Sequence, residues 1–234
     1  MTTQSNALVT GGSRGLGLAL CKQLAQEGFK VWMACRDTAA GRSLAQRLPG
    51  EVAVVEMDVT VPDSVKKALQ VVALADDKLD LLINNAGIYP SGDEYPQTQP
   101  ESLLMDTLAV NVGGAHSVIQ AAFPWLQLGQ NPAVVNVSSG YGSLALNAVQ
   151  HMDALCYCTS KAALNMLSLQ WSSVLTPLGI HICMPSPGWM RTSMGRADGK
   201  SPEQGAAIVL EAARLCRQGR LNKAYIGENG PIPW

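Results

Sequence analysis

Tyr157 and Lys161 stand four positions apart in the stretch CYCTSKAALN, residues 156–165. Side chains at positions i and i+4 share one face of a helix, with their Cβ atoms about 5–6 Å apart. A neighbouring ammonium group can stabilise a phenolate and lower the pKa of a tyrosine from its ordinary value near 10. The spacing therefore predicts an acid/base pair that works near neutral pH. A tyrosine packed in a core beside a solvated lysine would show the same spacing, so the rest of the chain must supply the reaction.

A glycine-rich segment, TGGSRGLG at 10–17, follows the first apolar run of the chain. Glycines between a strand and a helix allow a tight turn and let backbone N–H groups approach a pyrophosphate at the helix N-terminus. Gly11, Gly15 and Gly17 follow the spacing G-x-x-x-G-x-G instead of the common G-x-G-x-x-G. A glycine-rich turn can be a turn alone, but its place after a first strand favours a dinucleotide site.

The end of the second predicted strand, VWMACRD at 31–37, distinguishes between two nicotinamide cofactors. An acidic residue there would hydrogen-bond the ribose hydroxyls of NAD. Here Cys35 ends the predicted strand and Arg36 follows, while Arg14 lies in the glycine-rich turn. Two guanidinium groups suit the 2′-phosphate of NADP, which arginine binds in a bidentate manner. We therefore predict NADP(H), and Asp37 keeps NAD open if the strand ends one or two residues later.

Short apolar runs alternate with amphipathic segments along the chain. We expect strands at 7–10, 30–35, 52–59, 79–84, 133–139, 179–186 and 224–227. Helices are expected directly after the glycine-rich turn, from Tyr157 to about Leu175, and at 38–48, 62–75, 101–126 and 202–216. Strands rich in Val, Ile and Leu that alternate with helices indicate βαβ units and a parallel sheet. The predicted fold class is α/β: a Rossmann-type, doubly wound, mainly parallel seven-stranded sheet with helices on both faces, forming one dinucleotide-binding and catalytic domain over residues 1–234.

Composition and charge argue against several classes of function. The 234 residues carry a formal net charge of −1 and no cluster of Lys and Arg, so nucleic-acid binding is not expected. The chain opens on MTTQSNALVTGG without the features of a signal peptide, and no apolar stretch reaches the length of about 18–20 residues that spans a bilayer. Six scattered cysteines without an export signal indicate reduced thiols in a cytoplasmic protein, and the three separated histidines indicate no metal site.

Seven motifs occur in a fixed order: TGGSRGLG (10–17), MDV (57–59), NNAG (84–87), VNVGG (110–114), NVSS (136–139), YCTSK (157–161) and PGWMRT (187–192). In this ordered set the sequence resembles the short-chain dehydrogenase/reductases over nearly its full length, and most of all the small NADP-linked carbonyl reductases of the C-factor and Sniffer type. The resemblance implies an oxidoreductase that transfers a hydride from NADPH to the carbonyl of a ketone or aldehyde, with Tyr157 as the proton donor. It implies that Lys161 holds the nicotinamide ribose and lowers the pKa of Tyr157. Ser139 would hydrogen-bond the same carbonyl, and Asn111 would hold a water in a proton relay to Lys161.

The resemblance also implies a set of cofactor-binding residues. Besides Tyr157 and Lys161, the set comprises Gly11, Ser13, Arg14, Gly15, Leu16, Gly17, Arg36, Asp58, Val59, Asn85, Ala86, Gly87, Pro187, Gly188 and Thr192. For Asn84, in the same turn as Asn85, a purely structural role is nearly as well supported as contact with the cofactor. Tyr157 follows Ser139 at a longer interval than is common in the family, so an enlarged loop at 140–156 is expected beside the substrate. The longer interval leaves open whether Ser138 or Ser139 points inward, and the family pattern favours Ser139.

Two other functions are compatible with this fold. A dinucleotide-sensing regulatory protein would keep the fold but would need no proton donor, and a sugar-nucleotide epimerase would need a substrate domain for which the chain is too short. The expected substrate walls, 88–100, 140–156 and 189–200, hold Tyr89, Tyr95, Tyr141, Met152, Trp189 and Met194. This mixture indicates a mainly apolar carbonyl or alcohol substrate, and we expect no nucleic-acid or membrane partner. A homodimer or homotetramer is compatible with the apolar helices at 101–127 and 154–175.

Overall fold

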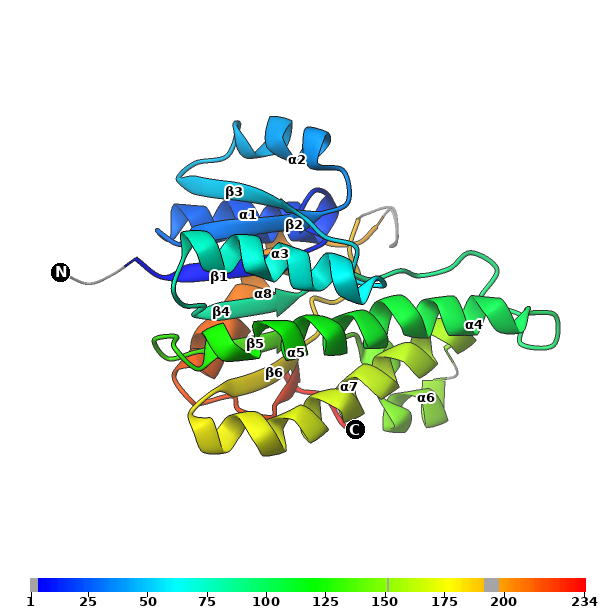
Figure 1. Cartoon of the computed structure of the whole chain (residues 1–234). Helices are drawn as coiled ribbons and strands as arrows, with labels where there is room; N and C mark the ends of the chain where they lie inside the picture. Colours follow the sequence, from blue (N-terminus) through cyan, green and yellow to red (C-terminus); the bar gives the residue numbers. More distant parts are fainter. Residues whose placement is uncertain (1–3, 151, 192–197) are drawn as a thin grey trace.

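The computed structural model describes residues 4–150, 152–191 and 198–234. Within these ranges, eight strands form one sheet in the order β3-β2-β1-β4-β5-β6-β7-β8. Figure 1 shows how β1 to β6 lie in this sheet. The strands are β1 (Asn6–Thr10), β2 (Lys30–Cys35), β3 (Glu51–Glu56), β4 (Leu81–Asn84), β5 (Ala133–Asn136), β6 (His181–Pro185), β7 (Tyr225–Gly227) and β8 (Gly230–Pro231). All pairs from β3 to β7 are parallel, and β8 is antiparallel to β7. The predicted doubly wound, mainly parallel sheet is confirmed.

The prediction of seven strands is one too few. The seven expected strands are all present, and the eighth is the two-residue β8, which folds back on β7. Gly230 permits this reversal because its φ of 109° is easily reached only without a side chain. A strand of two residues has no periodicity that a sequence pattern could show.

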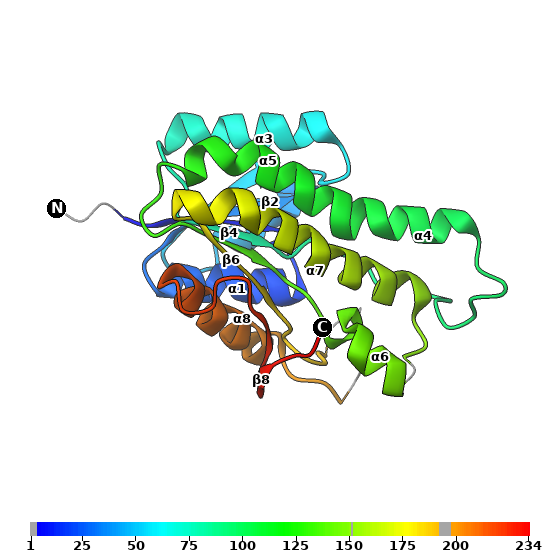
Figure 2. The same cartoon turned by 90° about the horizontal axis from the view of Figure 1, so that it is seen from below.

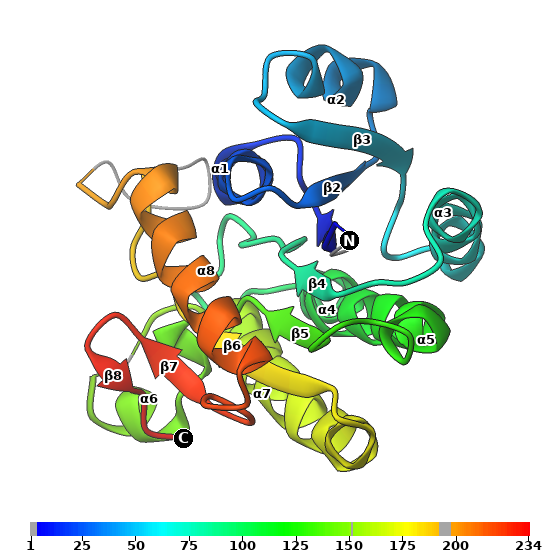
Figure 3. The same cartoon turned by 90° about the vertical axis from the view of Figure 1, so that its left-hand side faces the viewer.

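Helices cover both faces of the sheet (Figure 3). They are α1 (Gly15–Gln26), α2 (Thr38–Ala45), α3 (Pro62–Ala75), α4 (Glu101–Leu108), α5 (Ala115–Leu126), α6 (Leu144–Gln150), α7 (Leu155–Leu175) and α8 (Pro202–Arg217). One apolar cluster packs α1 and α8 on one face, and a second packs α3, α5 and α7 on the other. The central strands are buried on both sides, which is why they consist of nearly unbroken apolar residues.

The strand order reverses between β1 and β4. In open α/β sheets, ligands bind in the crevice outside the carboxyl ends of the strands at such a reversal. The segments that follow β1, β4, β5 and β6 are the glycine-rich turn, the NNAG turn, Ser138–Ser139 and the Pro187–Gly188 turn. The topology therefore gathers four of the sequence motifs at one edge of the sheet.

Two segments differ from their predicted form. The expected loop at 140–156 contains a short 3₁₀ turn, Gly140–Gly142, followed by helix α6. The end of the chain packs against this helix (Figure 2), where the Ala145 N–H donates to the Trp234 carbonyl oxygen at 2.9 Å. The expected helix at 101–126 is interrupted by a π-helical segment, Ala109–Gly114, between α4 and α5. In the described ranges, no helix combines the length and apolar character needed to cross a membrane.

Candidate active site

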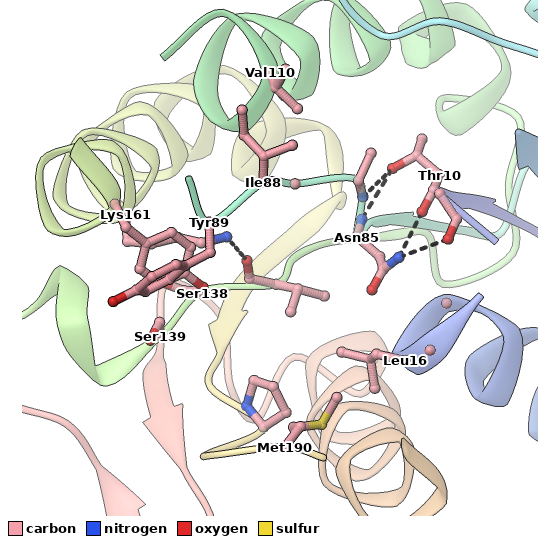
Figure 4. A pocket seen from close by; sticks show the side chains of 18 of the residues that line it. Thr10, Leu16, Asn85, Ile88, Tyr89, Val110, Ser138, Ser139, Lys161 and Met190 are labelled. Carbon is pink, nitrogen blue, oxygen red and sulfur yellow. Dashed lines mark hydrogen bonds between the residues drawn. The ribbon is translucent and has the colours of Figure 1, made fainter. Parts of the chain in front are cut away.

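A cavity of about 1130 Å³ lies at the carboxyl edge of the sheet (Figure 4). This volume is above the upper end of the about 300–1,000 Å³ usual for small-molecule pockets, so the cavity has room for an extended ligand. The following predicted site residues line it: Gly11, Ser13, Arg14, Gly15, Leu16, Gly17, Arg36, Asp58, Val59, Asn85, Ala86, Gly87, Ser139, Tyr157, Lys161, Pro187 and Gly188. Thr192, the remaining predicted cofactor contact, lies outside the described residues.

The glycine-rich turn is shaped by close approaches of the backbone. Gly11 has a φ of 64°, and a Cβ atom on Gly17 would overlap the carbonyl oxygen of Gly11. The NNAG turn is joined to this turn by hydrogen bonds, visible in Figure 4: Asn85 Nδ2 donates to the Thr10 carbonyl oxygen at 2.9 Å. Thr10 Oγ1 in return accepts the backbone N–H groups of Asn85 and Ala86, each at 3.0 Å. Thr10 was not singled out from the sequence, although a hydroxyl directly before the glycines was the signal for it.

Arg14 and Arg36 line the end of the cavity beside β2, and both side chains are exposed. Cys35 is the last residue of β2, as predicted, so the position that would hold an acidic residue for NAD holds a thiol. The carboxylate of Asp37 is engaged elsewhere, since its Oδ1 accepts the Ala40 N–H at 2.9 Å and caps α2. Arg14 and Arg36 are therefore two cationic groups at this part of the cavity, which Asp37 and Asp58 also line.

Tyr157 and Lys161 lie on the first turns of α7, as the spacing predicted. The Nζ atom of Lys161 lies 5.5 Å from the centre of the Tyr157 ring and donates a hydrogen bond to the Val137 carbonyl oxygen at 2.8 Å. Lys161 is only 6% exposed. Burial lowers the pKa of its ammonium group from 10.5 to about 8, because the low-dielectric surroundings disfavour the charged form.

The predicted depression of the Tyr157 pKa is wrong for the groups that this chain supplies. Burial raises the pKa of the Tyr157 phenol above its ordinary value, and the neighbouring Tyr89, Cys158 and Tyr141 add to the rise. The Ser139 side chain acts in the opposite direction but is the smaller effect. Tyr157 consequently holds its proton at neutral pH.

Ser138 and Ser139 point in different directions. Ser138 is 2% exposed, and its hydroxyl donates to Asn165 Oδ1 at 2.6 Å, away from Tyr157. The side chain of Ser139 lies close enough to the Tyr157 phenol to oppose part of the rise in its pKa, and its Oγ accepts the Tyr141 N–H at 3.3 Å. The carbonyl oxygen of Ser139 accepts the hydroxyl of Tyr225. Of the two serines, Ser139 therefore has the orientation expected from the family pattern.

Asn111 lies in the π-helical segment and, of the four predicted catalytic residues, is the one that does not line the cavity. Its Oδ1 accepts the Ile88 N–H at 2.8 Å, and its Nδ2 donates to the Ile88 carbonyl oxygen and to Ser160 Oγ, each at 2.9 Å. Both amide hydrogens are thus used by protein groups. Asn111 joins the NNAG segment to α7, and the water relay implied by the family resemblance stays a prediction. The π-helical insertion that carries it is a feature often found at functional sites.

Asn84 is 5% exposed and does not line the cavity. Its Nδ2 donates to Asn136 Oδ1 at 2.9 Å, which joins the ends of β4 and β5. The geometry therefore supports a structural role for Asn84 and not a contact with the cofactor.

An aromatic wall surrounds the Tyr157 ring. The ring of Tyr89 lies 4.7 Å from it and that of Tyr141 5.8 Å, measured between centroids, and Trp189 packs on Tyr141 at 5.2 Å. These residues and Met152 line the cavity, as expected for substrate walls. Tyr95 does not line it and is 66% exposed, so its assignment to the wall is wrong. Met194 lies outside the described residues.

Comparisons with known proteins agree with this geometry. The family model described as short chain dehydrogenase matches residues 5–203. The chain is 31% identical to salutaridine reductase of Papaver bracteatum, with 91% of each chain covered. It superposes with a TM-score of 0.87 on the NADPH-bound carbonyl reductase from chicken fatty liver, at 28% identity with 99% of each chain covered. The carbonyl reductase Sniffer of Drosophila melanogaster gives the same TM-score of 0.87 at 25% identity, with 99% of this chain and 100% of that chain covered. With the family model matched over most of its length, this chain belongs to the short-chain dehydrogenase/reductase family of oxidoreductases.

Proposed function

We propose that this chain is an NADPH-dependent carbonyl reductase that acts, as one dinucleotide-binding and catalytic domain, on an apolar ketone or aldehyde and reversibly on the corresponding alcohol. The observation that carries the proposal is the position of the Tyr157 phenol. It lies in the same cavity as the glycine-rich turn, near the Ser139 side chain and beside the buried ammonium group of Lys161. A nucleotide-binding turn and a proton donor that share one cavity suit hydride transfer coupled to protonation.

The residues present are suited to the cofactor. The backbone of the glycine-rich turn and the N-terminus of α1 would hold the pyrophosphate, since the N-cap residue Arg14 gives α1 no side-chain cap. Arg14 and Arg36 would hold the 2′-phosphate, and Lys161 would hold the nicotinamide ribose. The chicken carbonyl reductase with the same fold is bound to NADPH, which supports this assignment. When bound, the cofactor supplies the hydride.

The chain's own groups would then handle the developing negative charge. As hydride reaches the carbonyl carbon, the substrate oxygen becomes an alkoxide and needs hydrogen-bond donors aimed at it. The Tyr157 hydroxyl would donate first a hydrogen bond and then its proton, and the Ser139 hydroxyl would donate a second hydrogen bond. The raised pKa of Tyr157 suits the reduction direction, because the phenol stays protonated at neutral pH. Tyr89 and Tyr141 would exclude water from the reacting oxygen.

The test is a panel of apolar aliphatic and aromatic ketones and aldehydes, followed through the loss of NADPH absorbance and repeated with NADH. We expect turnover with NADPH on at least one member and a higher kcat/KM than with NADH. Tight binding of NADPH, measured by calorimetry, without turnover on any carbonyl would instead favour a dinucleotide-sensing protein. Equal affinity for both cofactors would contradict the assigned role of the two arginines.

A further inference from the structure

The carboxylate of Asp93 lies under the helix that carries Tyr157, although the two residues come from different segments. Asp93 belongs to the segment between β4 and α4 and is 0% exposed. Its Oδ1 accepts the Cys156 N–H at 2.7 Å, and its Oδ2 accepts the Tyr157 N–H at 2.9 Å. Its main-chain carbonyl oxygen accepts the Leu155 N–H at 3.2 Å. Asp93 thus accepts hydrogen bonds from the first three N–H groups of α7.

These contacts replace a cap that the helix itself lacks. The first N–H groups of a helix have no partner within it and are usually satisfied by a Ser, Thr, Asp or Asn directly before the helix. The N-cap residue of α7 is Ala154, which has no side-chain acceptor. A negative charge at a helix N-terminus is also favoured by the helix dipole. Asp93 therefore supplies from a distant segment both the acceptors and the charge that the local sequence does not.

A third residue orients the carboxylate. Gln99 Nε2 donates to Asp93 Oδ1 at 3.1 Å and to the Gly92 carbonyl oxygen at 3.0 Å. The Oε1 of Gln99 accepts the thiol of Cys156 at 2.9 Å. A fully buried carboxylate is costly unless it is hydrogen-bonded, and these contacts provide the compensation. The carboxylate has a defined place in the fold.

We propose that Asp93 is a positioning residue that sets the Tyr157 phenol against Ser139 by holding the backbone of Tyr157 itself. The role rests on the proposed reductase function, since it matters only if Tyr157 transfers a proton. A site that transfers protons needs its groups placed within about 0.5 Å of the productive geometry. The same contact ties the segment that carries Tyr89 to α7, so one carboxylate aligns the substrate wall with the proton donor.

The test is Asp93→Asn, which keeps the size of the side chain and turns one acceptor into an amide donor that faces a backbone N–H. We expect kcat for carbonyl reduction to fall by about 10- to 100-fold, because small displacements of a reacting group are costly. The KM and the NADPH affinity should change little, since Lys161 keeps its bond to Val137. Asp93→Glu, which restores a carboxylate, should recover part of the lost kcat. Glu94→Gln removes the same charge at the adjacent exposed position and should behave as the wild type.

A second measurement tests the capping of α7 by Asp93 without depending on catalytic turnover. Hydrogen exchange followed by mass spectrometry should show faster exchange at the amides of Cys156 and Tyr157 in Asp93→Asn than in Glu94→Gln, with the later turns of α7 unchanged. If Asp93→Asn does not fold, Gln99→Ala keeps the carboxylate but removes the amide that orients it, and should show both effects in weaker form. An unchanged kcat in a folded Asp93→Asn protein, or unchanged exchange at these two amides, would overturn the proposal. If the proposed reductase function is wrong, the wild type will reduce no carbonyl compound. The hydrogen exchange at Cys156 and Tyr157 would still show whether Asp93 caps α7.

Discussion

At the scale of single residues, Lys161 couples function to a cost in stability. Burial lowers the pKa of its ammonium group from 10.5 to about 8. Below pH 8 the group is charged in both the folded and the unfolded protein, and burying that charge on folding costs stability. We expect Lys161→Met to raise the free energy of unfolding at pH 7 by about 2–3 kcal/mol, since one pKa unit corresponds to about 1.36 kcal/mol. The same variant should bind NADPH more weakly. Urea unfolding and calorimetry measure the two effects.

The stability gain expected for Lys161→Met depends on pH. Between pH 8 and 10.5 the unfolded chain takes up the proton that folded Lys161 has lost, so the wild type becomes more stable as pH rises through this range. The difference between wild type and Lys161→Met should therefore shrink across the same range. Lys66→Met, at an exposed position of α3, is the matched control and should show no gain. A variant less stable than the wild type at pH 7 would contradict the account.

Tyr157 should ionise only at alkaline pH in the protein without added cofactor. Burial disfavours the phenolate and raises the pKa of Tyr157 above the ordinary tyrosine value of about 10. The ultraviolet difference spectrum between wild type and Tyr157→Phe should therefore show no phenolate signal below pH 10. An ionisation step between about pH 7 and 8 would instead support the depressed pKa expected from the Tyr–Lys spacing.

Arg36 should distinguish the two cofactors. A charge-assisted hydrogen bond contributes roughly 1.5–3 kcal/mol, so Arg36→Ala should weaken NADPH binding by about 10-fold or more and leave NADH binding unchanged. Arg42→Ala is the matched control, because this exposed arginine of α2 bonds Thr38 and does not line the cavity. Calorimetry with both cofactors measures the result. An equal loss for NADPH and NADH would place Arg36 at a group that the two share.

At the scale of elements, the turn after β1 depends on its lack of side chains. Because a Cβ atom on Gly17 would overlap the Gly11 carbonyl oxygen, Gly17→Ala must displace the turn or the start of α1. We expect a loss of about 1–3 kcal/mol in stability together with loss of NADPH binding. A Cβ atom on Gly113 would meet the Leu108 carbonyl oxygen at 3.8 Å, an ordinary contact, so Gly113→Ala serves as the control. Thermal unfolding and calorimetry check both, and near-normal NADPH affinity in Gly17→Ala would contradict the placement of the cofactor.

Elements with a strong local signal were predictable. Strand 30–35 and helix 62–75 have the predicted bounds, since the first is a buried apolar run and the second begins at Pro62 in a favoured position. The π-helical segment 109–114, helix α6 and strand β8 were not predicted. Each is short. The π-helical segment and α6 contact distant parts of the chain, through Asn111 with Ser160 and Ala145 with Trp234, whereas β8 pairs with the neighbouring β7 over only two residues.

At the scale of the whole molecule, the edge where the site lies could be predicted, but not its electrostatics. The alternation of strands and helices places motifs far apart in sequence at one edge of the sheet, so most of the predicted residues line one cavity. The pKa of Tyr157 depends on how deeply the folded chain buries its hydroxyl, and the capping of α7 by Asp93 joins positions more than sixty residues apart. Neither the pKa of Tyr157 nor the capping contact of Asp93 can be predicted from the spacing of neighbouring residues in the sequence.

The central claim is that the Tyr157 hydroxyl is the proton donor of an NADPH-dependent carbonyl reduction. The most direct test compares wild type, Tyr157→Phe and Tyr95→Phe on the best carbonyl substrate, with NADPH affinity measured for each protein. Tyr95 is 66% exposed and outside the cavity, so its variant controls for the loss of a hydroxyl elsewhere. We predict that kcat falls by about 10²–10⁴-fold in Tyr157→Phe alone, the usual contribution of general acid catalysis, while NADPH affinity is nearly unchanged. A Tyr157→Phe protein that binds NADPH and reduces the substrate at a near-normal rate would contradict the claim.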